Sequence, residues 1–171
     1  MLKLPIPDLI LNNIYELKPE ALRDMGVTLL LMDLDNTLDK YHALAPGIAL
    51  RNWIDALKKA AVEPFIYSNS HGRRAGRFAG ALGVAYINRA GKPDSKRLAA
   101  LLRAKGAAPE NTAIIGDQIY TDILCGKRAG IKAIAVRPID LSNPFRRLRY
   151  GAELPFRLAY KRRANIKEKK A

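Results

Sequence analysis

Two pairs of acidic residues in this sequence each come directly after an apolar run. Asp33 and Asp35 follow one run, and Asp117 and Asp122 follow another that lies much further along the chain. If the fold brings the two pairs together, their oxygens suit Mg²⁺, which is bound in proteins by one or two carboxylates. A carboxylate beside such a cation can attack phosphorus, while a second carboxylate moves protons. The two pairs therefore predict phosphoryl transfer that depends on a metal ion.

The expected division of roles follows from the positions of the acids. Mg²⁺ would lie between Asp33 and Asp117, because a cation must offset repulsion between an attacking carboxylate and the phosphate. Asp35, two residues further on, would protonate the leaving alkoxide and later take a proton from the attacking water. Asp33 and Asp35 are thus the candidate catalytic residues.

Groups that can bind phosphate follow two further apolar runs. Ser68 and Asn69 end one of these runs, and Lys92 stands shortly after the next. A hydroxyl, an amide and an ammonium group can all bind phosphoryl oxygens, the lysine as a point charge. In open parallel sheets, ligands bind beyond the carboxyl ends of the strands, where all these residues would meet. We therefore predict that Ser68, Asn69 and Lys92 bind the substrate phosphate.

Short apolar runs alternate with longer segments of helical periodicity, which is typical of a parallel sheet covered by helices. Most runs are apolar throughout, as expected of strands that are buried on both faces. The strands are predicted at Val27–Met32, Pro64–Tyr67, Val84–Ile87, Thr112–Ile115 and Lys132–Val136. The helices are predicted at Pro46–Ala61, Gly72–Leu82, Pro93–Lys105 and Thr121–Ala129. The expected class is α/β, a Rossmann-like three-layer fold with a central parallel sheet of about five strands.

The order of the polar residues resembles that of the haloacid dehalogenase (HAD) superfamily of phosphatases. Its four motifs are matched, in family order, by Asp33–Thr37, Ser68, Lys92 and the stretch from Gly116 to Asp122. The resemblance extends to about Val136 and excludes both ends of the chain. One pair of acids would be a weak signal, whereas four motifs in order are a specific one.

The resemblance implies a role for each acid. Asp33 would be the nucleophile, Asp35 the acid and base with its main-chain carbonyl on the metal, and Asp117 a direct ligand. Asp122 would orient water on the metal ion. The gaps on either side of Ser68 each hold one helix and one strand, so there is no room for a cap domain. This capless form is similar to subfamily IIIA and to phosphatidylglycerophosphate phosphatases, which implies a lipid phosphomonoester as substrate.

The two ends of the chain are predicted to be accessory. Residues 1–142 would form the phosphatase domain, with Pro7–Met25 as a partly helical extension, and residues 143–171 a basic, partly disordered segment. This segment has ten basic residues against two acidic ones, a net charge of +8 out of +14 for the chain. Basic and apolar residues together favour anionic phospholipid or nucleic acid, and a merely solvated tail is the alternative. Its removal is expected to spare hydrolysis of a small ester.

The sequence thus predicts a Mg²⁺-dependent phosphomonoester hydrolase that forms an aspartyl phosphate and acts on a membrane-borne lipid phosphate such as phosphatidylglycerophosphate. Two alternatives stay open: a phosphatase for nucleic-acid or protein phosphates, and a non-enzymatic module that binds RNA or ribosomes. The lone Cys125 and the lack of an apolar run of about 18 residues predict a cytoplasmic protein, peripheral on the inner face of the membrane. Mg²⁺ and Mn²⁺ accept the same oxygen ligands, and the oligomeric state is open.

Overall fold

A computed structural model describes residues 4–71 and 73–168 of the chain. Its strands are β1 (Leu9–Leu11), β2 (Leu29–Met32), β3 (Glu63–Tyr67), β4 (Ala85–Ile87), β5 (Thr112–Gly116) and β6 (Lys132–Val136). They form one six-stranded sheet in the order β1-β6-β5-β2-β3-β4, in which every neighbouring pair is parallel. The predicted α/β class with a central parallel sheet is confirmed, with one strand more than expected.

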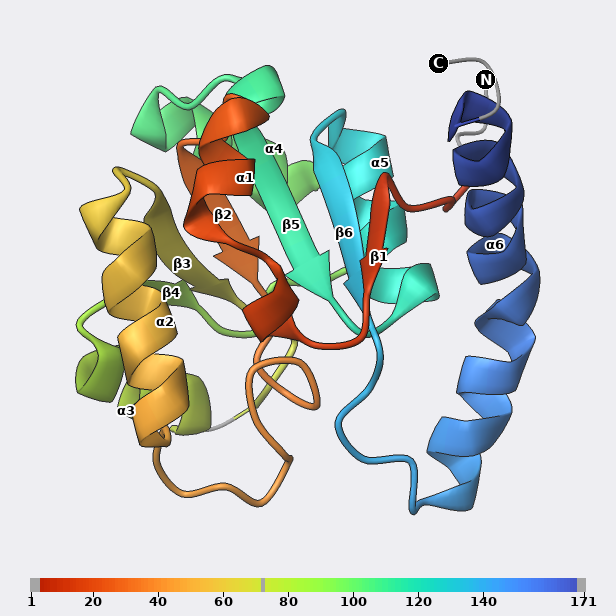
Figure 1. Ribbon diagram of the computed structural model, residues 1–171. Coiled ribbons are helices and arrows are strands. Elements are labelled where there is room, and N and C mark those ends of the chain that lie inside the picture. The colour runs from red at the N-terminus through yellow and green to blue at the C-terminus, as the bar shows by residue number, and fades with distance from the viewer. Residues whose placement is uncertain (1–3, 72, 169–171) are drawn as a thin grey trace.

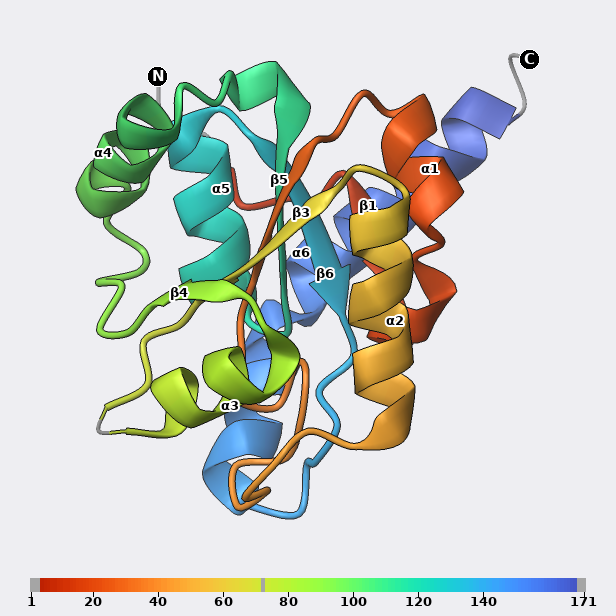
Figure 2. The same cartoon turned by 90° about the vertical axis from the view of Figure 1, so that its left-hand side faces the viewer.

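Helices cover both faces of the sheet (Figures 1 and 2). The longer helices are α1 (Pro19–Asp24), α2 (Ile48–Lys59), α3 (Arg74–Leu82), α4 (Lys96–Lys105), α5 (Leu124–Ala129) and α6 (Pro144–Glu168). Single turns lie at η1 (Ile14–Glu16), η2 (Pro109–Asn111) and η3 (Ile119–Ile123). Within the described residues, no cap domain is inserted between the strands. Gly72, the first residue of the helix predicted at Gly72–Leu82, lies outside the described residues.

Alternate residues of the central strands enter two different cores. Leu30 and Met32 of β2 pack in a cluster with α1, α2 and α3, whereas Leu29 and Leu31 pack in a second cluster with α4 and α5. Every residue of β2 and β5 is therefore buried. Continuous apolar runs are what a strand needs when both of its faces are covered. This burial holds the carboxyl ends of β2 and β5 rigidly side by side.

The prediction for the N-terminal segment was partly wrong. Leu9–Leu11 is not helical but forms strand β1, which pairs in parallel with β6, Leu9 opposite Ile134. The remainder is partly helical as expected, at η1 and α1. A run of three apolar residues fits the periodicity of a helix as well as that of a strand. The segment forms a strand because the free edge of β6 offers main-chain hydrogen-bond partners.

In the C-terminal segment, residues 144–168 form the single helix α6, and the expected partial disorder of the segment stays a prediction. Figure 1 shows this helix standing beside the β1 edge of the sheet, with its first turns at the end of the molecule to which the strands point. Its contacts with β1 and η3 supply the partners that a local reading of the sequence could not see. Residues 169–171 lie outside the described residues, and the division of the chain at residue 142 stays a prediction. No described helix is long and apolar enough to cross a membrane.

Candidate active site

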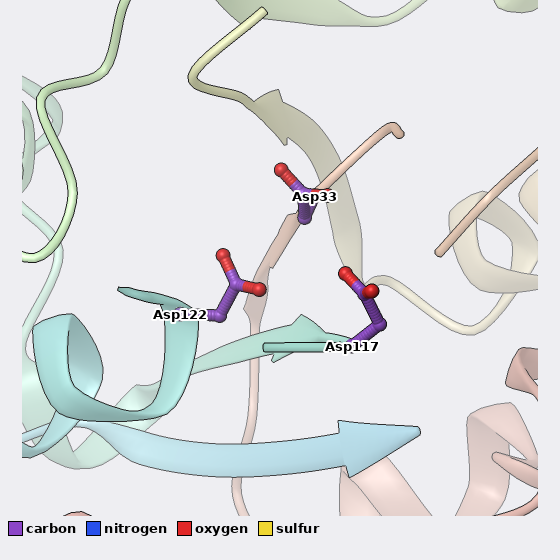
Figure 3. A group of neighbouring side chains, drawn as sticks. All are labelled: Asp33, Asp117 and Asp122. Carbon is purple, nitrogen blue, oxygen red and sulfur yellow. The ribbon is translucent and has the colours of Figure 1, made fainter. Parts of the chain in front are cut away.

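Three carboxylates meet beyond the carboxyl ends of β2 and β5. Asp33 follows β2, Asp117 follows β5, and Asp122 lies in η3; one oxygen from each lies within 4.8 Å of the others. Figure 3 shows the three side chains facing a common space. All three residues are buried, with exposed fractions of 5%, 1% and 1%. The sheet order, in which β2 and β5 are neighbours, brings together acids that are more than eighty residues apart.

Lys92 neutralises part of this cluster. Its ammonium lies 2.6 Å from Oδ1 of Asp33 and 2.5 Å from Oδ1 of Asp122. Burial alone would lower the pKa of Lys92, but the Asp122 and Asp33 carboxylates raise it above its usual value. The lysine therefore stays protonated and offers a fixed positive charge beside the expected nucleophile.

Asp117 has the features of a cation ligand. Burial, reinforced by the Asp122 and Asp33 charges, raises its pKa well above the usual range. One oxygen, Oδ1, accepts a hydrogen bond from the Thr37 hydroxyl at 3.2 Å, and that hydroxyl accepts from the Asp117 main-chain N–H at 2.9 Å. The other oxygen, Oδ2, is buried without a hydrogen-bond partner among the described residues. A buried, unpaired carboxylate oxygen is costly, and a divalent cation would satisfy it.

Gly116 lets Asp122 reach the cluster. A Cβ atom at this glycine would lie 2.3 Å from Cγ of Asp122, closer than any real contact. Asp122 is held there because its Oδ2 accepts a hydrogen bond of 3.1 Å from the Gln118 N–H. Burial raises the pKa of Asp122 to about 6, although Lys92 opposes the shift. Gly116 is therefore a packing requirement beside the predicted metal ligand Asp117.

Asp35 points to a different partner. Its Oδ1 lies 2.8 Å from Nε of Arg74, whose other nitrogens donate to the main-chain carbonyls of Ala43 and Lys40 at 2.8 and 2.6 Å. Burial raises the pKa of Asp35; Arg74 lowers it, and the Asp33 charge raises it further. The sequence contains a run of arginines at the start of α3, but their order does not show which one reaches an acid.

A pocket of about 320 Å³ opens beside Asp33, and its wall also includes Asp35, Tyr41, Ser68, Asn69 and His71. Ser68 is buried at the end of β3, and its Oγ accepts from the Ser70 N–H at 3.2 Å. Asn69 is tied to Lys92, because its amide donates to the Lys92 carbonyl at 2.8 Å and accepts from the Lys92 N–H at 2.9 Å. Asn69 thus supports Lys92 directly, and its predicted role in binding phosphate stays a prediction.

Side chains of α6 reach the mouth of this pocket. The Arg146 guanidinium lies 4.0 Å from the ring centroid of Tyr41. Burial raises the pKa of the Tyr41 hydroxyl, and nearby Arg149 opposes the shift. Further along α6, Glu153 and Arg157 are buried against the loop that carries Asp117. No local pattern in the sequence separates these residues from the other charges of the basic segment.

The comparison with known proteins agrees with this geometry. Residues 89–138, which include Lys92, Asp117 and Asp122, match the HAD-hydrolase-like family model. The chain is 34% identical over 140 residues to the probable phosphatase YqeG of Bacillus subtilis, covering 82% of this chain and 81% of that protein. The chain belongs to the HAD superfamily. The expected enzyme class, a HAD-type phosphatase for phosphoric monoesters, is confirmed.

Two further proteins resemble this HAD protein, one in sequence and one in fold. The chain is 31% identical over 155 residues to phosphatidylglycerophosphate phosphatase 1, chloroplastic, of Chlamydomonas reinhardtii, covering 83% of this chain but only 56% of that protein. In the fold comparison, the cobalt-bound form of deoxy-D-mannose-octulosonate 8-phosphate phosphatase from Haemophilus influenzae matches with a TM-score of 0.51 and 15% identity. That match covers 67% of this chain and 80% of the other, and it supports the fold alone.

Proposed function

We propose that this HAD-type phosphatase hydrolyses its substrate through an aspartyl phosphate on Asp33 and uses Mg²⁺ as its metal ion. The observation that carries the proposal is the buried cluster of three carboxylates around the Lys92 ammonium. So many buried acids are expensive unless cations balance them, and Lys92 supplies only one positive charge. The unpaired Oδ2 of Asp117 supports the proposal that a second cation binds there.

The first step forms the covalent intermediate. A carboxylate oxygen of Asp33 attacks phosphorus, the bond between phosphorus and the ester oxygen breaks, and Asp35 donates a proton to the leaving alkoxide. Lys92, 2.6 Å from Asp33, holds a positive charge where the phosphoryl oxygens arrive. A bound Mg²⁺, held by Asp33, Asp117 and the main-chain carbonyl of Asp35, would offset the repulsion between carboxylate and phosphate.

The second step restores the enzyme. Asp35 takes a proton from water as the water oxygen attacks phosphorus, and the bond from phosphorus to the Asp33 oxygen breaks, releasing inorganic phosphate. The environment of Asp35 suits both roles. Burial raises its pKa, which favours the protonated form needed first, while Arg74 at 2.8 Å stabilises the carboxylate needed next.

We further propose that the substrate is a lipid phosphomonoester at the surface of an anionic membrane. The pocket is open to solvent and no cap closes over it among the described residues, so a phosphate carried on a large surface can reach Asp33. The first turns of α6 lie at the same end of the molecule (Figure 1) and expose Phe145 by 82% and Leu148 by 74%. Exposed Arg147 lies between them, so apolar and basic groups face outward together, as in helices that lie on anionic lipid.

The direct test is phosphate release from phosphatidylglycerophosphate in mixed micelles with Mg²⁺. Wild-type protein is compared with Asp33→Asn, and with Asp24→Asn as a control at an exposed acid. Release that requires both Asp33 and the metal supports the nucleophile and the lipid substrate together. Activity on a generic ester without release from the lipid would retain the phosphatase and redirect the search to nucleic-acid or protein phosphates. Full activity of Asp33→Asn would contradict the mechanism.

The membrane surface can be tested separately from the chemistry. In the double variant Phe145→Ser/Leu148→Ser, we expect hydrolysis of a soluble chromogenic ester to be unchanged. Phosphate release from substrate in anionic vesicles should fall by about thirtyfold or more, because each of the two apolar side chains contributes roughly 1–2 kcal/mol on burial. Leu4→Ser is the matched control, since Leu4 is 63% exposed and lies in the N-terminal segment before β1. An equal loss with both variants would argue against α6 as the membrane contact.

A further inference from the structure

Helix α6 carries two charged residues that are almost completely buried. Glu153 is 1% exposed and Arg157 is 5% exposed, although both belong to residue types that usually remain in water. They lie one helical turn apart, and Nη2 of Arg157 is 3.6 Å from a carboxylate oxygen of Glu153. Burial raises the pKa of Glu153, while Arg157 opposes the shift.

The ends of both side chains are directed at the main chain of the Asp117 loop. Nη2 of Arg157 donates to the carbonyl oxygen of Asp117 at 2.7 Å, and both terminal nitrogens lie 3.3 Å from the carbonyl of Val136 in β6. Oε1 of Glu153 accepts from the N–H of Ile119 at 3.0 Å. The two side chains therefore hydrogen-bond to the loop on both sides of Gln118, and Arg157 also links the loop to β6.

Aromatic side chains shield this contact from water. The ring centroid of Tyr150 lies 4.7 Å from the Arg157 guanidinium. Tyr120, in the same loop, packs edge-to-face on Phe156 at 5.6 Å, and its hydroxyl donates to the Ala152 carbonyl at 3.1 Å. Hydrogen bonds to charged groups are stronger where water is excluded, so the loop is held more firmly than by helix packing alone.

The arrangement is costly for stability. A buried ion pair can often be replaced by apolar residues of similar size without loss of stability. Nε of Arg157 is buried and has no hydrogen-bond partner among the described residues, which adds to the cost. What an apolar pair could not supply is the hydrogen bonding to the Asp117 carbonyl and the Ile119 N–H.

We propose that Glu153 and Arg157 are positioning residues for the metal site, which makes α6 part of the active site. They hold the Asp117–Ile119 main chain so that the Asp117 carboxylate faces Asp33 before any ligand arrives. The catalytic consequence rests on the proposed function. The structural consequence, a metal ligand fixed in advance, rests only on the metal site and not on the hydrolysis, because it concerns how strongly the protein binds a divalent cation.

The deciding variant is the double change Glu153→Leu/Arg157→Met. It removes both charges together, so no lone buried charge remains and the fold should persist. A loss of a few degrees of melting temperature is expected, because the Ile119 N–H and the Asp117 carbonyl lose their hydrogen-bond partners. Binding of Mn²⁺, followed by electron paramagnetic resonance without substrate, should weaken by about tenfold or more, the scale seen when partners that orient metal ligands are lost. Hydrogen exchange at the Ile119 amide should become faster. Arg162→Met, an exposed change on the same helix, should alter none of these.

Glu153→Gln provides the rescue. The amide oxygen can still accept the hydrogen bond from the Ile119 N–H. Mn²⁺ affinity should therefore stay within about threefold of wild type, because only the charge of this one hydrogen-bond acceptor is lost. A folded double variant that binds Mn²⁺ as tightly as wild type would overturn the proposal. If the double variant does not fold, Arg157→Lys is measured instead, and unchanged Mn²⁺ affinity there is equally decisive against it.

The measurements distinguish a failure of the proposed function from a failure of the positioning role. If wild-type protein binds Mn²⁺ but hydrolyses no phosphomonoester, the proposed function falls while the weakened binding of the double variant still supports positioning. If wild-type protein is active and the double variant keeps both its Mn²⁺ affinity and its turnover, the function stands and the positioning role falls.

Discussion

Two regions of the molecule hold Asp117, and they differ in how they are encoded. The strand-end region acts on the side chain, through Thr37 and the neighbouring carboxylates, and its residues stand in short motifs directly after strands. The helix region acts on the main chain, through Arg157 and Glu153, which lie within a long basic segment without any motif. The residues proposed to do the chemistry can therefore be recognised from short sequence motifs. The residues that fix their geometry lie on a helix without a recognisable motif.

If this distinction is right, changes in the strand-end region should have the largest effects on turnover. Asp35→Asn should slow turnover by roughly a hundredfold or more, because it removes a general acid and base. The effect should appear in kcat for a soluble chromogenic ester at saturating Mg²⁺, with little change in Mn²⁺ affinity. Asp55→Asn, at an exposed position on α2, is the control. A loss confined to membrane-borne substrate would contradict the role of Asp35.

Gly116→Ala should have an effect of similar or slightly smaller size. The new methyl group must displace Asp122, from which its Cβ would be only 2.3 Å away, and with it a partner of Lys92. A displacement of about 1 Å in an active site costs on the order of a hundredfold in rate. Gly80→Ala is the matched control, because a Cβ there meets no atom within 4 Å. Wild-type turnover in Gly116→Ala would show that the position of Asp122 does not matter.

Removal of residues 143–171 sharpens the comparison. The sequence alone suggested that a small soluble ester would still be hydrolysed normally, but the contacts of Glu153 and Arg157 now lead us to expect a loss of about tenfold or more on that ester as well. Circular dichroism must show that the shortened protein is folded. Normal hydrolysis by the folded, shortened protein would show that α6 is not needed for catalysis.

The smallest expected effect is a dependence of stability on pH. Asp122 has a pKa raised to about 6 in the folded protein, against about 3.9 in an unfolded chain, so the folded state binds more protons between these values. Metal-free protein should therefore lose a few degrees of melting temperature as pH rises from about 4 to about 6. Mg²⁺ should restore more stability at pH 7 than at pH 5. An equal gain at both pH values would argue against a cation at these acids.

Much of the core could be predicted because its signals are local. The central strands are recognisable as continuous apolar runs, and the topology of a parallel sheet then requires the acids that follow them to meet at one edge. Strand β1 could not be recognised in the same way. Its three apolar residues have no preferred period of their own, and only the unpaired edge of β6 makes them a strand.

By itself, the sequence determined which residues could do the chemistry, because a nucleophile, a proton shuttle and oxygen ligands depend on side-chain type and on the strand that each one follows. Only the tertiary structure decided how they are held: Arg74 on Asp35, Asn69 on the main chain of Lys92, and Arg157 on that of Asp117. These contacts join residues 23 to 40 positions apart. Their geometry depends on how elements pack against one another, and no periodicity within a single element records that packing.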